Sequence, residues 1–556
     1  MTSANYKEIS AIARKRRAAN ISAYFQVPVV DKDTLPNNLV EYALNSDYYD
    51  TRELEIIQSE AIPILQNIKE RKWTALEVAK AFCKASALAQ ELTNCLTEVL
   101  YPEAMERAQF LDDHLARTGN TVGPLHGLPI SLKDSFITAP HPSSIGLAHL
   151  ANIPTTKDAT LVNILRKLGA VFYCKTNIPT AMMMMETNNN VWGECINPHH
   201  KKLSPGGSSG GEGAMIAIRA SPLGVGTDIG GSIRIPAGWC HLYGLKPSFG
   251  RFPSTGQQPS IAGNELILAV NGPMSRSLDS LKLYCESLLS ADVAPWQFDH
   301  KCLPIPWRKE IIQPKGRKLR LGFIGSHDGL CHVHPPVQRA LDTTQKALEE
   351  AGHEIVHWDA TKLHPVIVKT LIAAFFDLGG KAISQLLEPY GEPVFPSMEG
   401  YSLAAKAELN MTQMRQNVIQ RNSLQQQFLD DWNATATDDK PPIDGIIMAV
   451  SPWAAPRLGN TQTNKYVGFT GVWNYLDFPA CTFPVTFADK ALDSVQDMST
   501  FQHLSEVDRS MQADYDADFY HGAPVSLQIA GKRLEEEKVL EMVEIVADTL
   551  RAANIR

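Results

Sequence analysis

The chain has 556 residues, a formal net charge of −8 and 44% apolar residues, a composition typical of a globular protein with a large core. The mild acidity argues against an extended nucleic-acid-binding surface. The sequence contains no run of 18 apolar residues, so no transmembrane helix is predicted. The nine cysteines are dispersed, form no C-x-x-C pair and follow no secretory signal. We therefore expect reduced thiols, a cytoplasmic location, and neither nucleic-acid nor membrane binding.

The first quarter of the sequence predicts mainly helices. Residues 1–72 are polar and helical, and we expect them to wrap the outside of the core. The basic tetrad Arg14–Arg17 is interpreted as the charged face of an exposed helix rather than as a nuclear signal. A capping box at Thr74–Glu77 begins the next helix, and a second helix is expected over 102–117. Alternating apolar residues then predict a short strand over 128–132.

Helices and strands continue to interleave along the rest of the chain. Two helices with proline-rich linkers are expected over 255–310, mostly helical structure over 366–430, and an acidic surface excursion over 493–520. The further predicted helices cover 159–169, 212–220, 335–352 and 534–552, and the further strands cover 169–173, 223–226, 319–324, 353–358, 444–450 and 525–530. This order predicts an α/β fold with helices on both faces of a sheet, and the length makes two or more domains the default.

The stretch Ser204–Pro247 is dense in glycine and carries serines 208, 209 and 232 beside those glycines. It alternates glycine turns with apolar runs, which is typical of tight turns on a packed core rather than of a flexible linker. Neither the P-loop pattern nor the dinucleotide-binding pattern fits. The hydrolase elbow G-x-S-x-G does match at Gly206–Gly210, but no strand precedes it, as that motif requires.

A serine nucleophile needs a base, and the glycine-rich stretch offers only His241, which we interpret as structural. Lys133 lies near the end of an apolar strand. It either pairs with Asp134 at the surface or is buried with a lowered pKa, in which case it can serve as the base. Four consecutive methionines, Met182–Met185, either line an apolar pocket or fill the core. Cys331, His332 and His334 lack further ligands at suitable spacing, so neither a metal nor another cofactor is expected.

Several motifs together resemble the amidase signature family, and within it most closely the fungal acetamidases. They include SLKD at 131–134, GGSSGGEGA at 206–214, GVGTDIGGSIRIPA at 224–237 and GVWNYLDFPA at 471–480. The resemblance extends from about residue 76 to 537. It implies a single three-layer α/β/α domain around a mixed, twisted sheet, so the two-domain default yields to it.

The expected organisation is then an N-terminal helical wrap over 1–72 and one catalytic domain over 73–556. Within that domain, the signature core covers about 123–250 and a variable substrate-side region covers about 255–450. The resemblance assigns Ser232 as the acylated nucleophile, Lys133 as the base, and Ser208 as the serine that bridges them, with a cis peptide bond before it.

The resemblance also assigns the groups around this triad. The oxyanion hole is assigned to the amides of Ile229, Gly230, Gly231 and Ser232, and the supporting positions are Ser209, Asp228 and Arg234. We further expect Met182, Met184, Ser208 and Trp473 to contact the substrate, with Trp473 extending the apolar wall that the methionines form. Because glycines at 230 and 231 have no side chain, consecutive amides can converge on one point there.

The expected activity is hydrolysis of small uncharged carboxamides to a carboxylate and ammonia through an acyl-enzyme. The partner is therefore a small-molecule amide, and the resemblance also implies a homodimer. Two alternatives stay open. One is an esterase, an amidase or an acyl transferase of a specialised pathway that uses the same triad. The other is a non-catalytic binding or assembly subunit, against which the intact Lys133, Ser208 and Ser232 count.

Overall fold

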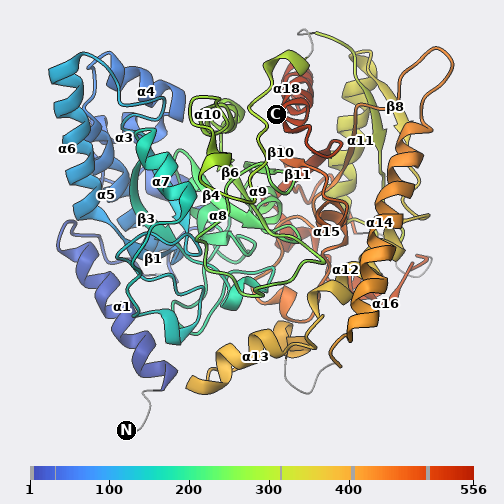
Figure 1. Ribbon diagram of the computed structural model, residues 1–556, viewed down its shortest axis with the longest axis horizontal. Coiled ribbons are helices and arrows are strands. Elements are labelled where there is room, and N and C mark those ends of the chain that lie inside the picture. Colours follow the sequence, from blue (N-terminus) through green and yellow to red (C-terminus); the bar gives the residue numbers. More distant parts are fainter. Residues whose placement is uncertain (1–4, 32, 313–315, 402–406, 496–500, 556) are drawn as a thin grey trace.

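A computed structural model describes residues 5–31, 33–312, 316–401, 407–495 and 501–555. Within these residues a mixed sheet of 11 strands runs through the molecule in the order β1-β3-β2-β4-β6-β5-β10-β11-β9-β7-β8 (Figure 1). The strands are β1 Leu96–Val99, β2 Pro129–Lys133, β3 Val171–Thr176, β4 Gly224–Asp228, β5 Tyr243–Lys246, β6 Val270–Ser275, β7 Arg320–Phe323, β8 Glu354–His357, β9 Gly445–Ala449, β10 Ala480–Phe487 and β11 Pro524–Ala530. The predicted α/β class and mixed sheet are confirmed.

The sheet is parallel at two places and antiparallel elsewhere. β2 pairs in parallel with β3 and β4, and β7 pairs in parallel with β8 and β9. The α-helices are α1 Tyr6–Ser22, α2 Leu39–Leu44, α3 Thr51–Gln58, α4 Ala61–Lys69, α5 Ala75–Thr93, α6 Tyr101–Thr118, α7 Thr160–Lys167, α8 Gly210–Ala217, α9 Arg234–Trp239, α10 Leu278–Leu288, α11 Pro335–Glu350, α12 His364–Phe375, α13 Lys381–Leu387, α14 Met411–Asn433, α15 Gly468–Tyr475, α16 Glu506–Ala513, α17 Ala517–Tyr520 and α18 Glu536–Ala552.

Helices lie on both faces of the sheet, as strand β11 illustrates. Side chains alternate between the two faces of a strand. Ser526 and Gln528 of β11 both bond to α9, through the Gly238 carbonyl and the Arg234 side chain, so α9 covers that face. The side chains between them point to the other face, where α18 packs against β10 and β11. The described residues include no helix that is both long and apolar enough to cross a bilayer.

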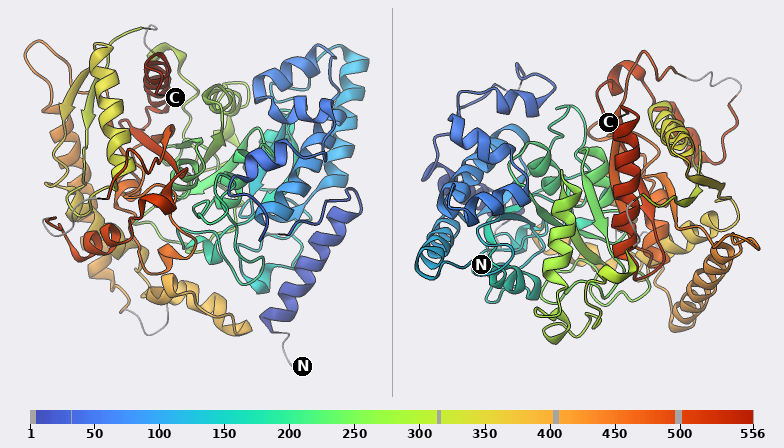
Figure 2. Two further views of the ribbon diagram at one scale, coloured as in Figure 1. Left: turned by 180° about the vertical axis from the view of Figure 1, so that it is seen from behind. Right: turned by 90° about the horizontal axis from the view of Figure 1, so that it is seen from above.

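The N-terminal helices lie at one end of the molecule, opposite the region from α11 to α14 (Figure 2). The prediction of an exposed charged face over Arg14–Arg17 is wrong for Arg17, whose side chain is only 7% exposed. Its guanidinium donates to the Leu96 carbonyl and lies 5.1 Å from the centre of the Trp192 ring. Arg16 pairs with the buried Glu98. The basic cluster therefore anchors α1 to the first strand of the sheet.

Strands β5, β6 and β10 do not follow from the sequence pattern. Glycine and proline normally indicate loops, and these strands carry Gly244, Gly272, Pro273 and Pro484. Tertiary packing overrides that signal. A Cβ on Gly272 would lie 2.0 Å from the Leu245 carbonyl oxygen, so β6 can pass beside β5 only with glycine there.

Two other segments differ from the expectation. Of the two helices expected over 255–310, the structure has one α-helix, α10, followed by two single 3₁₀ turns, Pro295–Gln297 and Lys309–Ile311. The excursion over 493–520 is tied to the core where it is described: Asp493 pairs with Arg339, and Asp508 accepts from His332. Residues 496–500 of that excursion lie outside the described part of the chain.

Candidate active site

Two glycine-flanked loops bring the predicted serines together. Ser208 lies just before α8 and is buried, whereas Ser232 lies between β4 and α9 and is half-buried. The Ser209 amide donates to the Ser232 carbonyl across 3.1 Å, and the Ser209 hydroxyl accepts from the Thr227 amide at the end of β4. The Gly207–Ser208 peptide bond is cis. Ser208 and Ser232 line one cavity.

Lys133 is the last residue of β2 and is fully buried. Its Nζ lies 2.7 Å from Ser208 Oγ and 2.6 Å from Thr227 Oγ1. Burial lowers the pKa of Lys133 to about 7, although Asp228 and Glu212 oppose the shift. The alternative in which Lys133 pairs with Asp134 at the surface is wrong, because that carboxylate is itself buried and accepts from Thr97, Ser144 and the Ile145 amide.

The loop after β4 presents backbone amides beside Ser232. The hydrogen bonds of the described residues leave the amides of Ile229, Gly230 and Ser232 without an acceptor. The Gly231 amide differs, because it donates to Asp228 Oδ1 across 2.8 Å. The assignment of Gly231 as an oxyanion donor is therefore corrected: its N–H shapes the loop and leaves three amides free. Free N–H groups next to a hydroxyl are the donors that a developing oxyanion requires.

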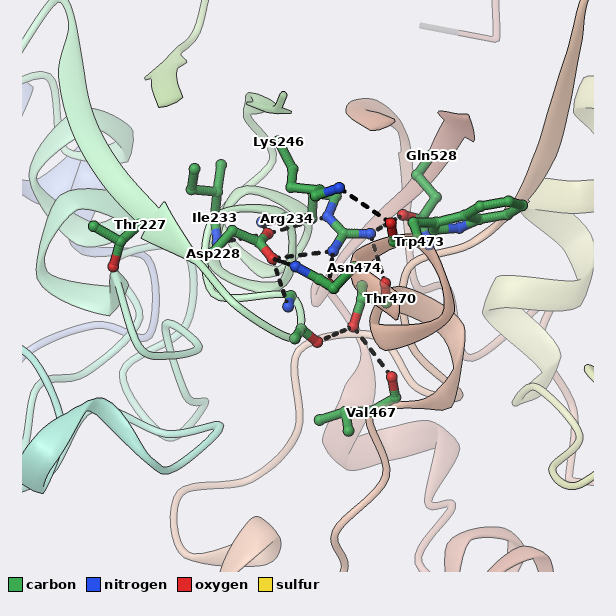
Figure 3. A network of polar contacts seen from close by, with 12 residues as sticks. Thr227, Asp228, Ile233, Arg234, Lys246, Val467, Thr470, Trp473, Asn474 and Gln528 are labelled. Carbon is green, nitrogen blue, oxygen red and sulfur yellow. Dashed lines mark hydrogen bonds and ion pairs between the residues drawn. The ribbon is translucent and has the colours of Figure 1, made fainter. Parts of the chain in front are cut away.

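The carboxylate of Asp228 is the centre of a fully buried polar network (Figure 3). It accepts from the Arg234 guanidinium, the Asn474 amide and the backbone of Gly231 and Ile233. Burial alone would raise the pKa of Asp228, but the charge and hydrogen bonds of Arg234 lower it to about 2, so this group is a carboxylate. The network fixes the loop that carries Ser232.

Helix α15 closes this network from the other side. The Thr470 hydroxyl donates to the Gly230 carbonyl across 2.6 Å, and its own carbonyl accepts from Arg234 (Figure 3). Arg234 also donates to Gln528 of β11. The sequence reasoning did not single out Thr227, Thr470, Asn474 or Gln528. The signal for Asn474 was present, since this residue lies inside the GVWNYLDFPA motif.

Two cavities meet at Ser232. One, of about 350 Å³, is apolar and is lined by the four methionines, Ile235, Phe375 and Tyr466, among others. The second, of about 430 Å³, contains Ser208, Thr227 and the loop 254–265 in its wall. Met182, Ile229 and Ser232 border both. Both interpretations of the methionine run hold, because Met182 and Met184 border the cavity while Met184 and Met185 are also buried in the hydrophobic core.

Trp473 was expected as a substrate contact, and the structure places it elsewhere. Its side chain is fully buried, and its ring packs edge-on against Phe428 and parallel to Phe478. It does not border the cavity beside Ser232 in the described part of the chain. The reason is helical geometry: Thr470 and Trp473 leave α15 in different directions (Figure 3), so Thr470 contacts the serine loop and Trp473 packs against Phe428 of α14.

Comparisons with known proteins agree with one another. A family model described as Amidase matches residues 77–540. The chain is 37% identical to an acetamidase of Emericella nidulans over 98% of each protein, and 34% identical to an acetamidase of Aspergillus oryzae over 99% of this chain and 100% of that one. A solved structure of fatty acid amide hydrolase superposes with a TM-score of 0.89 at 31% identity, covering 98% of this chain and 94% of that chain.

These matches define an enzyme class, the hydrolases that act on carbon–nitrogen bonds in amides. The chain belongs to the amidase family, whose model spans most of its length. The resemblance drawn from the sequence motifs is confirmed.

Proposed function

We propose that the protein hydrolyses small uncharged carboxamides to a carboxylate and ammonia through an acyl-enzyme on Ser232. The observation that carries the proposal is the contact between the buried Lys133 amine and Ser208, in a cavity that Ser232 also lines. A neutral amine accepts a proton, and an intervening hydroxyl can relay it from the nucleophile.

In the proposed mechanism Ser232 Oγ attacks the amide carbon while its proton passes to Ser208 and the proton of Ser208 passes to Lys133. The negative charge that develops on the amide oxygen is stabilised by the free amides of Ile229, Gly230 and Ser232, and each such donor is worth about 3 kcal/mol of barrier. Lys133 returns the proton through Ser208 to the departing nitrogen, which leaves as ammonia. Water then attacks the acyl-enzyme by the same relay, and the carboxylate leaves.

The size and polarity of the cavities support a small substrate. An apolar space of about 350 Å³ is near the lower end of ordinary ligand pockets, which suits a short aliphatic or aromatic acyl group. Two relatives are named acetamidases, which favours the same class of substrate. We place the acyl group against the methionine wall and the departing nitrogen and incoming water on the side of Ser208.

A panel of amides tests this proposal. Ammonia release should be measured with short aliphatic, aromatic and long-chain lipid amides, with the matching esters and with an added amine acceptor. We expect short primary amides to be the best substrates. Turnover of long-chain lipid amides alone would contradict the proposal, and preferred cleavage of esters or acyl transfer to the amine would instead favour a specialised pathway enzyme. No turnover of any of these by the folded protein would favour the non-catalytic subunit.

The remaining expectations stand as parts of the proposal. We propose that residues 73–556 form one catalytic domain with the wrap over 1–72 around it, and that the enzyme works in the cytoplasm as a homodimer. Limited proteolysis tests the domain division, because one domain should give no stable fragment that ends inside 73–556. Light scattering tests the dimer, and a monomeric mass would overturn it.

A further inference from the structure

A second buried acid lies beneath the strand that carries Lys133, and the mechanism above does not use it. Glu212, in the first turn of α8, is fully buried. Its carboxyl oxygens contact two hydroxyl groups: Oε2 lies 2.5 Å from Ser131 Oγ, and Oε1 lies 2.8 Å from Thr176 Oγ1. Ser131 is two residues before Lys133 on β2, and Thr176 is the residue opposite Lys133 on β3. The acid therefore lies among the immediate neighbours of the proposed base.

The surrounding backbone is fitted to this carboxyl group. Gly224 of β4 is the residue opposite Ser131. A Cβ on Gly224 would lie 1.9 Å from Glu212 Oε2 and 2.7 Å from Ser131 Oγ, so any other residue there would displace the acid. The site holds a carboxyl group next to β2 and leaves it no room to move away.

The number of hydrogen atoms available to the groups around this carboxyl group favours a proton on it. The hydroxyl of Ser131 also contacts Ser221 Oγ at 2.9 Å, and Ser221 Oγ lies 2.9 Å from the Leu223 carbonyl oxygen. With the contact from Thr176, four oxygen–oxygen contacts link these groups, but Ser131, Ser221 and Thr176 supply only three hydroxyl hydrogens. With an ionised Glu212 one of these four contacts would carry no hydrogen, whereas a protonated Glu212 supplies the fourth hydrogen. Every contact is satisfied when Glu212 donates to Ser131, Ser131 to Ser221, and Ser221 to the carbonyl.

We propose that Glu212 is a protonated carboxylic acid in the resting enzyme, and that it acts as a positioning residue that keeps Lys133 neutral by leaving no negative charge beneath it. The inference rests on the proposed role of Lys133 as the base. In the proposed arrangement Glu212 carries a proton and Lys133 does not, and the hydroxyl chain that ends at the Leu223 carbonyl favours this arrangement. The base is then unprotonated although its neighbour is an acid.

The electrostatic surroundings of Glu212 agree with this assignment. Burial raises the pKa of Glu212 to about 7, although its hydrogen-bond contacts with Ser131 and Thr176 oppose the shift. The other titratable groups that face it are Lys133 of β2, Tyr173 and Cys174 of β3, and Cys95 between α5 and β1. Burial raises the pKa of the phenol and of both thiols, so these groups are neutral and offer the acid no compensating positive charge.

Ser221→Ala tests the proposal because it removes the hydroxyl group that links Ser131 to the Leu223 carbonyl. Ser131 then has no acceptor except Glu212, which favours the ionised acid, and a carboxylate beneath Lys133 raises the pKa of the lysine. We expect the acidic limb of the kcat/KM profile to move to higher pH by about one unit. The Leu223 carbonyl still accepts from the Ser131 amide, so the strand pairing is preserved. Ser10→Ala is the matched control, a buried serine that also donates to a carbonyl, and should leave the limb in place.

The Glu212→Gln background separates this mechanism from a structural effect. Glutamine imitates the protonated acid and cannot ionise, so Ser221→Ala should not move the limb when Glu212 is already glutamine. A shift of equal size in both backgrounds, or no shift in either, would overturn the proposal.

Infrared spectroscopy tests the protonation state without any turnover. The difference spectrum of wild type minus Glu212→Gln at neutral pH should contain the carbonyl stretching band of a protonated acid. A carboxylate band in its place would refute the assignment even if the proposed catalytic role of Lys133 were correct. Conversely, a protonated-acid band in an enzyme that retains activity without Lys133 would leave this inference about Glu212 intact and remove the role proposed for the base.

Discussion

The two sides of the cavity beside Ser232 differ in how their residues are held. On the side of Lys133, Ser208 and Asp228, every one of these side chains is at most 1% exposed and makes directional polar contacts. On the apolar side, formed by α12, the 3₁₀ turn Pro396–Tyr401 and the loop 459–467, the side chains that line the cavity are mainly rings and aliphatic groups. Phe376, for example, stacks on Tyr401 with ring centres 4.6 Å apart.

This difference indicates which side of the cavity tolerates amino-acid substitutions. Hydrogen-bonded geometry in a buried network tolerates little displacement, because each unpaired group carries a large desolvation penalty. Apolar packing has no such directional requirement, and volume-conserving changes are tolerated. Ile372 of α12, which borders the apolar cavity, is also 43% exposed, so this side reaches the protein surface. We therefore expect the polar side to set the chemistry and the apolar side to set the choice of acyl group.

The largest effect is expected on the polar side, at Lys133. Lys133→Ala removes the proposed base and should lower kcat by roughly 10²–10⁴-fold, measured by steady-state ammonia release. Lys133→Arg should not restore activity, because a guanidinium stays protonated. Circular dichroism should show that both variants keep the native fold. A Lys133→Arg enzyme with near wild-type turnover would remove lysine from the role of base.

A second substitution tests the buried network rather than the base. Asp228→Asn leaves the Arg234 guanidinium without its carboxylate, which should cost about 3–5 kcal/mol of unfolding free energy, measured by chemical denaturation. The matched control is Asp548→Asn, which breaks an ion pair with Arg551 in which the two side chains are 60% and 61% exposed. We expect a much smaller loss there. Equal losses of unfolding free energy would mean that burial does not increase the cost of breaking this ion pair.

On the apolar side the expected effect is smaller and selective. Phe375 borders the apolar cavity, and its ring approaches the place where a side chain on Gly230 would be. Phe375→Ala enlarges the acyl pocket, so the ratio of kcat/KM for a longer amide to that for acetamide should rise by about 10–200-fold. A uniform loss for all amides, with no change in this ratio, would mean that Phe375 supports the oxyanion loop instead of setting specificity.

The smallest expected effect is the pH dependence of kcat/KM in the wild-type enzyme. Because burial lowers the pKa of Lys133 to about 7, the lysine is protonated and inactive below that pH and neutral above it. The kcat/KM should therefore rise as pH climbs through about 7 and level off above it. Below the midpoint the rise should be about tenfold per pH unit. A flat profile between pH 5 and 9 would contradict a titrating base, as would activity that falls across this range.

The sequence predicted much of this site because its motifs are local. Lys133, Ser208 and Ser232 each lie in a short, glycine-flanked or strand-end motif. The structure places the Lys133 amine beside Ser208, and Ser208 and Ser232 border one cavity. Thr227 adjoins Asp228 in one of those motifs, yet its hydroxyl contact with Lys133 depends on the alignment of β2 and β4, which no local pattern encodes.

What the sequence did not predict depends on long-range packing. The hydrogen bond from the Gly231 amide to Asp228 depends on the conformation of the loop. Residue types alone do not show whether this amide is bonded or free. Trp473 was assigned to the pocket because it is large and apolar, but the same properties suit the core, and only the rotation of α15 decides between them. Strand β6 was missed because its glycine and proline indicate a loop until the backbone of β5 is beside it.

Identification of the acylated serine tests the central claim most directly. The protein should be treated with a fluorophosphonate, digested and mapped by mass spectrometry, with Ser208→Ala and Ser232→Ala in parallel. We predict an adduct on Ser232 in wild type, slow labelling of the same residue in Ser208→Ala, and no labelling in Ser232→Ala. An adduct on Ser208 with Ser232 unmodified would contradict the account and restore the hydrolase elbow at Gly206–Gly210.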